Sequence, residues 1–254
     1  MSVLRVLIDP PADGAWNMAV DEALLESAAA GGAATLRFYQ WSEPTLSLGY
    51  FQRAADRDQH AASRLCPLVR RASGGGAIVH DRELTYSVAW PMRDTRIKAA
   101  TNLYDACHET LVEVLAAMAV KATIYRPLPD ACTSGSQARE SPPPFLCFQR
   151  RSCGDILCGA HKIVGSAQRR SRGAVLQHGS ILLSRSSCAP ELPGIRELTT
   201  KYLEIPELSE SWLTCLSRRL SVSLATSTLS TREAASAREF CETRFANETY
   251  NSRR

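Results

Sequence analysis

The sequence predicts an α+β fold in which a central mixed or antiparallel sheet is flanked by helices. Three observations favour this class. Short segments that alternate in polarity or are rich in aromatic residues recur along the chain, three of them in close succession between residues 155 and 183. Helical periodicity is confined to a few longer segments. No repeat or linker divides the chain, so we expect one domain over 1–254, with a core at about 15–225 and a C-terminal helix over 230–251.

The elements of the first half follow from periodicity and turn residues. A helix is predicted over 16–30, because Trp16, Val20 and Leu24 share one face and two glycines follow at 31 and 32. A second helix is predicted over 102–119, with Asn102 as its cap. The strands expected in this half are 36–41, 45–49, 68–71 and 84–90.

The second half begins with a long loop over 127–144, which ends in three prolines and which we expect to be functional or mobile. Three strands then form an antiparallel meander with tight turns. They are predicted at 155–158, 162–168 and 174–183. The remainder is predicted to be helical, over 210–225 and from Ser230, where Glu233 completes a capping box.

Composition excludes several classes of protein. No apolar run approaches the roughly 20 residues that cross a bilayer, and the N-terminus shows no secretory signal. The nine cysteines are therefore expected to be reduced thiols in a cytoplasmic protein. The net charge of +4 comes from scattered arginine pairs, where a nucleic-acid-binding protein would carry one concentrated basic stripe. We expect no nucleic-acid or membrane partner.

The strongest local feature is a triple glycine, Gly74 to Gly76, preceded by Arg71 and followed by His80. Consecutive glycines let the backbone approach a ligand and turn its N–H groups toward one point, and Arg71 offers a forked cation for a phosphate or carboxylate. A flexible hairpin turn explains the glycines equally well. A dinucleotide site is disfavoured, because the G-x-G-x-x-G pattern is missing and a strand follows.

Two further segments carry polar residues where a strand is expected. Lys162 begins a strand of apolar and small residues, an unusual place for a lysine unless its amine is used, although an edge lysine is the simpler interpretation of that segment alone. His178 lies mid-strand before Gly179, where a core histidine with satisfied hydrogen bonds is the simpler interpretation.

Together these segments resemble the lipoate and octanoate branch of the biotin/lipoate protein ligase superfamily. The resemblance covers roughly residues 15–185 and includes the segments 17–24, 36–41, 46–52, 70–81, 83–87, 161–169 and 173–183. It implies a catalytic domain of the class II aminoacyl-synthetase and biotin-ligase type, with an acyl tunnel along the triple-glycine and Lys162 strands.

The resemblance also implies the site residues. The Lys162 amine would lie near the acyl carbonyl. The substrate-binding residues would be Arg71, Ser73, Gly74, Gly75, Gly76, His80, Tyr86, Gly165, Ser166, Ala167, Gln168, His178, Gly179 and Ser180.

The branch contains two chemistries, and Cys147-Phe148 favours one of them. This pair stands fifteen positions before Lys162 and resembles the octanoyltransferases whose nucleophilic cysteine precedes a phenylalanine. Such an enzyme moves octanoate from octanoyl-acyl carrier protein, through a cysteine thioester, to a lysine of a lipoyl domain. The acceptor would be the glycine-cleavage H protein or a 2-oxoacid dehydrogenase subunit, and no cofactor or metal is required. The alternative is a lipoate-protein ligase, which uses ATP and Mg.

Several alternatives stay open at this point. Cys153 or Cys132 are weaker candidates for the nucleophile. A zinc site is another interpretation of four residues near the loop, although no C-x-x-C pair is present: Cys147, Cys153, Cys158 and His161. A non-catalytic protein that sequesters lipoyl domains is disfavoured by the presence of both Cys147 and Lys162. A biotin ligase is less consistent with the sequence, because its arginine- and glycine-rich phosphate loop is not apparent.

Overall fold

The computed structural model describes residues 3–94, 100–127 and 144–253. Within these residues eight strands form one sheet, in the order β11-β1-β2-β6-β10-β9-β8-β7, and three form a second sheet, in the order β4-β3-β5. The strands are β1 (Val3–Ile8), β2 (Thr35–Tyr39), β3 (Thr45–Leu48), β4 (Leu68–Arg70), β5 (Ile78–His80), β6 (Glu83–Pro91), β7 (Thr123–Ile124), β8 (Ile156–Cys158), β9 (His161–Ser171), β10 (Ala174–Leu182) and β11 (Ser223–Thr226).

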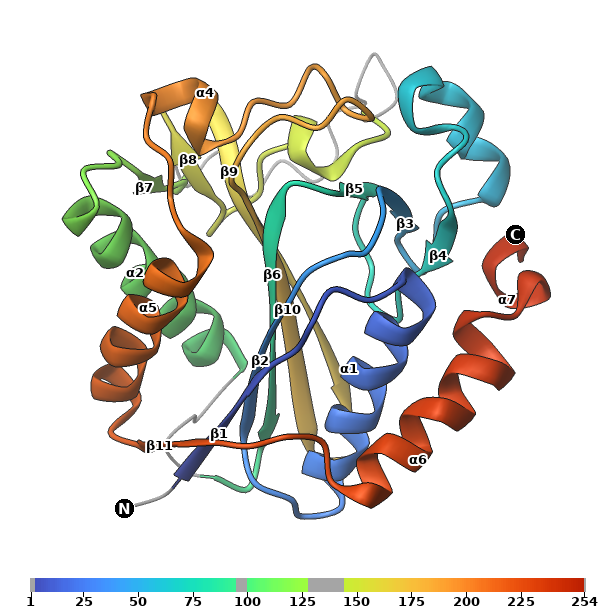
Figure 1. The fold of residues 1–254 in the computed structure, drawn as a ribbon, viewed down its shortest axis with the longest axis vertical. Coiled ribbons are helices and arrows are strands. Elements are labelled where there is room, and N and C mark those ends of the chain that lie inside the picture. Colours follow the sequence, from blue (N-terminus) through green and yellow to red (C-terminus); the bar gives the residue numbers. More distant parts are fainter. Residues whose placement is uncertain (1–2, 95–99, 128–143, 254) are drawn as a thin grey trace.

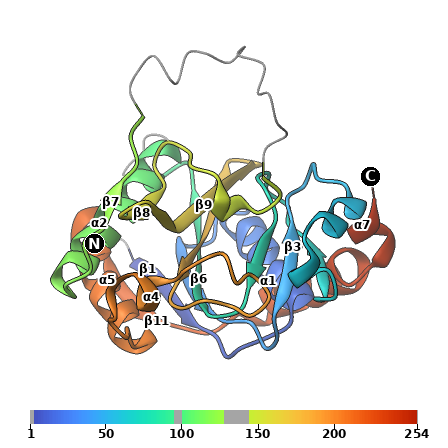
Figure 2. The same cartoon turned by 90° about the horizontal axis from the view of Figure 1, so that it is seen from above.

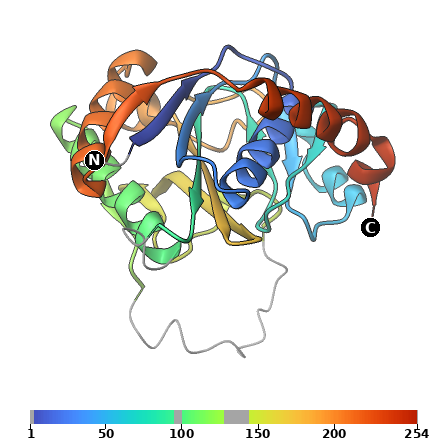
Figure 3. The same cartoon turned by 90° about the horizontal axis from the view of Figure 1, so that it is seen from below.

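Helices cover both faces of the larger sheet (Figure 1). The α-helices are α1 (Gly14–Ala29), α2 (Ala100–Ala117), α4 (Ile195–Thr199), α5 (Ile205–Leu220), α6 (Thr231–Phe240) and α7 (Glu248–Ser252). Short 3₁₀ segments are η1 (Ala54–Gln59), η2 (Ala61–Ser63) and η3 (Cys147–Gln149), and a π-helical turn, η4 (Cys241–Phe245), extends α6. Helices α2 and α5 lie on one face, whereas α1 lies on the other with α6 outside it (Figure 3).

The larger sheet is mixed, as the sequence predicts. Strands β11, β1 and β2 run parallel to one another, and every pairing from β2 to β7 is antiparallel. The main core lies between this sheet and the α2–α5 layer. There the ring of Trp212 packs against Phe38 and Tyr86, at centroid distances of 5.6 and 4.7 Å. The α+β prediction is therefore confirmed.

Local sequence signals place several element ends correctly. The first helix begins two residues earlier than predicted, because the Asp13 side chain caps it by accepting a hydrogen bond from the Trp16 N–H at 2.8 Å. It ends before Gly31, whose φ of +102° suits glycine. The capping box of Ser230 and Glu233 opens α6 as expected.

Other expectations were wrong. Residues 221–225 are not helical: Ser221 takes a left-handed conformation at the end of α5, and β11 then pairs with the edge strand β1. Asn102 is not the cap, because α2 already includes Ala100. Strands β1, β5, β7 and β11 and helix α4 were not predicted. Of the predicted loop 127–144, residues 128–143 lie outside the described residues.

No helix among the described residues is long and apolar enough to cross a membrane. The second sheet stands beside the end of the larger one where β9 begins. Seen from above, the segment that follows residue 144 runs between β8–β9 and the second sheet (Figure 2). A bridge between Ala77 and Leu146 fixes it there, so this segment meets both sheets at one place.

Candidate active site

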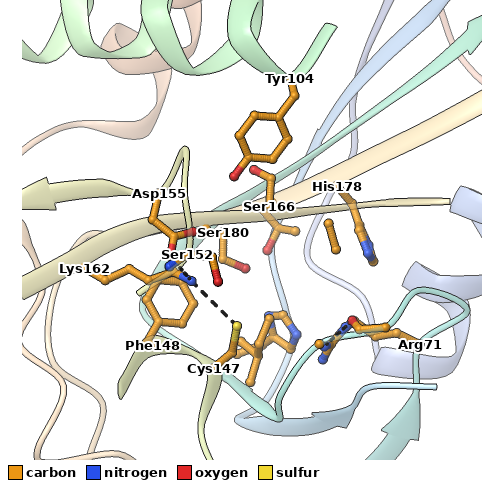
Figure 4. Close-up of a pocket in the computed structure, with 18 of the residues that line it drawn as sticks. Arg71, Tyr104, Cys147, Phe148, Ser152, Asp155, Lys162, Ser166, His178 and Ser180 are labelled. Carbon is orange, nitrogen blue, oxygen red and sulfur yellow. Dashed lines mark hydrogen bonds and ion pairs between the residues drawn. The ribbon is translucent and has the colours of Figure 1, made fainter. Parts of the chain in front are cut away.

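A cavity of about 260 Å³ opens where the two sheets and the 144–155 segment meet (Figure 4). This is slightly below the range of small-molecule sites, roughly 300–1,000 Å³. Most of the predicted site residues line it: Arg71, Gly74, Gly75, His80, Cys147, Lys162, Gly165, Ser166, Ala167, His178, Gly179 and Ser180. Apolar and aromatic side chains complete the wall, namely Met18, Tyr39, Ile78, Tyr104 and Phe148.

Cys147 is held at the cavity by the end of the glycine segment. Its N–H donates to the Ala77 carbonyl at 2.7 Å, and the Ala77 N–H donates to the Phe145 carbonyl at 3.1 Å. A methyl group on Gly76 would lie 3.1 Å from the Cys147 nitrogen, tighter than ordinary side-chain contacts. Gly76 therefore allows the cysteine segment to approach, although it does not itself line the cavity.

Lys162 is the second residue of the long strand β9 and is buried, with 6% of its surface exposed. Its Nζ lies 3.7 Å from Cys147 Sγ and 5.2 Å from the ring centre of Phe148. A methyl group on Gly165 would come within 2.4 Å of the Lys162 Cε, so glycine is needed there for the amine to reach the cysteine. The structure thus brings the two predicted catalytic residues together.

Asp155 is the residue of this group that sequence reasoning missed. Its Oδ2 lies 2.9 Å from Lys162 Nζ and accepts the Ser152 N–H at 2.6 Å. Burial raises the pKa of the Asp155 carboxyl above its ordinary value, while Lys162 opposes the rise. Its place in the sequence could have indicated this role. Asp155 directly precedes β8, and the turn at Gly159 folds β8 against β9, which brings the carboxylate to Lys162.

Arg71 braces the glycine segment. Its guanidinium donates to the Ser47 carbonyl and Oγ at 2.8 and 2.6 Å and to the Gly76 carbonyl at 2.8 Å. The expected anion-binding role is therefore not visible in its hydrogen bonds. Ser47 Oγ also bonds His80 Nε2 at 2.6 Å, and His80 Nδ1 bonds the Glu83 carboxylate at 2.6 Å. Ser47 and His80 therefore connect the buried Arg71 guanidinium to the buried Glu83 carboxylate.

The register of β9 against β10 gathers the remaining predicted residues. Ser180 pairs with Gly165, Gly179 with Ser166 and His178 with Ala167, and Gly179 lies opposite Tyr86 on the other neighbour, β6. His178 Nε2 bonds Ser73 Oγ at 2.5 Å. Burial, followed by the nearby Arg71 and His80, lowers the pKa of His178 to about 3, so its imidazole is neutral at pH 7.

A chain of hydrogen bonds runs beneath the cavity. From Gln168 it passes through Gln177, Tyr86 and Ser166 to His108, with steps of 2.9, 2.9, 2.6 and 2.7 Å. His108 Nδ1 lies 2.7 Å from the Gly154 carbonyl, which can only accept, so Nδ1 carries the proton and Nε2 accepts from Ser166. Sequence reasoning missed His108 because it sits on the buried and mostly apolar face of α2.

His108 should give folding stability a specific dependence on pH. Burial lowers its pKa to about 4 from an ordinary value of 6.5. Between these values the unfolded chain binds a proton that the folded chain does not, so stability is lost as the pH falls through that window. The loss is up to about 1.4 kcal/mol per pH unit.

Urea unfolding of wild type and His108→Gln between pH 4 and 7 checks this. As the pH falls, the free energy of unfolding should decrease more steeply for wild type than for His108→Gln. The difference in slope should correspond to about one extra proton bound on unfolding. Parallel curves would contradict the assignment of a neutral His108.

The alternative site residues do not gather at one place. Cys153 is exposed at the cavity rim, Cys158 is buried in β8 and His161 is exposed at the β8–β9 turn. In the part of the chain that the structure describes, no three histidine, cysteine or acidic side chains form a group that could hold a metal ion. The proposed zinc cluster therefore does not form. Cys132 lies outside the described residues.

Comparison with known proteins shows the family of the chain. Residues 13–203 match the model of the lipoyl protein ligase A/B catalytic domain. The octanoyltransferase LipM of Brevibacillus brevis is 31% identical over the full length of both chains. The octanoyltransferase LipM of Kyrpidia tusciae is 40% identical over 72% of this chain and 67% of its own.

Solved structures of similar fold include lipoate ligases. Protein Ta0514 of Thermoplasma acidophilum, described as a lipoate protein ligase and solved with lipoic acid, superposes with a TM-score of 0.78 at 24% identity over 99% of each chain. A lipoate-protein ligase A solved with ATP superposes with a TM-score of 0.75 at 25% identity, again over 99% of each chain.

Proposed function

The chain belongs to the lipoyl protein ligase A/B catalytic-domain family, and we propose that it is an octanoyltransferase that works through a thioester on Cys147. One observation carries the proposal. A cysteine thiol lies 3.7 Å from a buried lysine amine at a cavity lined by apolar and aromatic side chains. Nucleophilic catalysis by cysteine requires a thiol beside a group that handles its charge and proton.

In the first half-reaction the Cys147 thiolate attacks the carbonyl carbon of an octanoyl thioester. The new C–S bond forms, the bond to the donor sulfur breaks, and the donor leaves as a thiol. Because one thioester replaces another, this exchange needs no ATP. The Lys162 ammonium at 3.7 Å stabilises the thiolate. The octanoyl chain would lie along the cavity, where burial contributes roughly 0.8 kcal/mol per CH₂.

In the second half-reaction the amine of an acceptor lysine attacks the Cys147 thioester. A tetrahedral oxyanion forms and collapses to an amide, and the thiolate returns. Backbone N–H groups of the glycine segment, Gly74 to Gly76, would hold the oxyanion. The catalytic residues that we propose are the two predicted from the sequence, Cys147 and Lys162, together with Asp155.

The partners follow from the chemistry. An acyl carrier protein would be the donor, and a lipoyl domain, such as the glycine-cleavage H protein or a 2-oxoacid dehydrogenase subunit, the acceptor. The cysteines among the described residues are all free thiols, as an enzyme with a thiol nucleophile needs, and this supports a place in the reducing cytoplasm.

Two arginines beside the nucleophile should recruit an acidic donor. Arg150 and Arg151 directly follow η3, and Arg151 is exposed. We expect the double change Arg150→Glu and Arg151→Glu to raise the KM for octanoyl-acyl carrier protein by about tenfold at low salt, and less at high salt. Octanoyl-pantetheine, a small thioester, should react at the wild-type rate.

Arg232→Glu controls for the reversal of a surface charge, because Arg232 is exposed and belongs to α6, which lies well away from β8 and the start of β9 (Figure 1). An equal loss of activity with octanoyl-acyl carrier protein and with octanoyl-pantetheine would show that the two arginines act on the chemistry. That result would contradict a docking role.

The alternative is a lipoate-protein ligase, which the fold also accommodates. One assay separates the two. Octanoyl-acyl carrier protein without ATP, and free lipoate with ATP and Mg, are each supplied with a lipoyl domain, and modification of the domain is measured. We expect modification with the first donor alone. Modification with the second alone would make the protein a ligase.

A further inference from the structure

The buried ammonium of Lys162 has two neighbours that can carry negative charge. Asp155 Oδ2 lies 2.9 Å from it and Cys147 Sγ 3.7 Å from it, and the side chains of Lys162 and Asp155 are each only 3% exposed. A charge that has lost its water must be matched by an opposite one. One ammonium matches one anion, so the carboxylate and the thiolate are not both ionised beside it.

Several other polar groups that line the cavity keep their charge over a wide pH range. Burial lowers the pKa of Arg71 only to about 10, so it stays cationic, and its hydrogen bonds go to Ser47 and the glycine segment. Burial keeps His108 and His178 neutral, with pKa values of about 4 and 3, and raises the pKa of the Tyr104 phenol. Cys153 is exposed to solvent. Lys162 lies within reach of both Cys147 and Asp155, so a proton can pass among these three groups.

The Asp155 carboxyl group is held in one position, where it can accept a proton. Its Oδ2 is fixed by the Ser152 N–H at 2.6 Å, and the preceding Gly154 is anchored through its carbonyl to His108 and through its N–H to Tyr125. Burial raises the pKa of the carboxyl, so it accepts a proton more readily than an exposed aspartate does.

Resting on the proposed octanoyl transfer, we propose that Asp155 stores the proton that the nucleophile gives up, with Lys162 as the relay. When Cys147 ionises, Lys162 takes the proton from Sγ as it passes one of its own to the Asp155 carboxylate. The trio then holds a thiolate, an ammonium and a carboxylic acid. Its net charge is unchanged, so the buried site never carries an unmatched charge.

The stored proton has a defined route through the reaction. In the first half-reaction the C–S bond to Cys147 forms, the donor sulfur leaves with its electron pair, and the proton returns from Asp155 through Lys162 to that sulfur. In the second, the acceptor nitrogen bonds the carbonyl carbon and loses a proton to Lys162 and so to Asp155, while the C–S bond breaks and Cys147 leaves as a thiolate. One proton therefore travels from the acceptor amine to the donor thiol in each cycle.

Alkylation of Cys147 by iodoacetamide tests this without any acyl substrate. In Asp155→Asn the thiolate is the one anion left beside Lys162, so Cys147 should be alkylated faster than in wild type, by roughly tenfold near pH 6. A carboxylate that merely holds Lys162 in place predicts the opposite, because a displaced amine leaves the thiol less reactive.

Trypsin separates Cys147 from Cys153, because it cleaves after Arg150 and Arg151. The alkylation of each can therefore be followed by mass, with Cys153 as the internal control. Asp155→Glu, which keeps the carboxylate, should be alkylated at close to the wild-type rate, and Lys162→Met should slow alkylation. Asp155→Ser, which is smaller, gives the same comparison if the asparagine variant does not fold.

Unchanged or slower alkylation of Cys147 in the folded Asp155 variants would overturn the proposal. Failure of the proposed octanoyl transfer is recognised separately, because wild type would then form no octanoyl-enzyme whatever the alkylation rates.

Discussion

Cys147→Ala is expected to lower the rate of ATP-independent octanoyl transfer by roughly 10⁴-fold or more, since it removes the atom that carries the acyl group. Stability should change little, because Cys147 is only partly buried and its backbone hydrogen bond to Ala77 does not involve the side chain. The measurement is octanoylation of a lipoyl domain under single-turnover conditions, with the thermal unfolding of the variant recorded alongside.

Cys153→Ser is the matched control, because this cysteine also lines the cavity but is exposed at its rim. It should transfer octanoate at close to the wild-type rate. If Cys153→Ser were inactive and Cys147→Ala active, the nucleophile would have been assigned to the wrong thiol.

Lys162→Met should have the second largest effect, on both activity and stability. The change removes the group beside Cys147 Sγ that stabilises the thiolate and relays protons, so transfer should slow by roughly 10²–10⁴-fold. It also leaves the Asp155 carboxylate buried without its partner. Breaking a buried ion pair on one side typically costs about 3–5 kcal/mol, and protonation of Asp155 should reduce that cost as the pH falls.

The free energy of unfolding by urea at pH 6 and pH 8 measures the second effect, which should be larger at pH 8. Lys121→Met, at an exposed lysine beyond α2, controls for the loss of a charge. Full activity of Lys162→Met would remove the lysine from the mechanism.

The sequence predicted the parts of the fold that local signals specify. The Gly31 helix end and the Ser230 capping box concern residues adjacent in the chain. Short edge strands were missed because their partners are distant: β11 forms against β1, more than 200 residues away, and its four residues carry no strong pattern of their own. Residues 221–225 were predicted as the end of a helix because α5 directly precedes them.

The site shows the same division. Cys147 and Lys162 were found through a family resemblance, and the structure brings them within 3.7 Å. Arg71 was found too, but its hydrogen-bond partners could not be predicted. Ser47 and the Gly76 carbonyl come within reach of its guanidinium only in the folded chain. Asp155 and His108 were missed because each looks ordinary in its own segment and gains its partner only across the fold.

Intact-mass spectrometry of the purified protein with octanoyl-acyl carrier protein, without ATP, tests the central claim most directly. Wild type should gain one octanoyl group, hydroxylamine should remove it as octanoyl hydroxamate because it is held as a thioester, and Cys147→Ala should gain none. An unmodified wild-type protein that forms an acyl-adenylate once ATP and lipoate are added would contradict the account and assign the chain to the ligases.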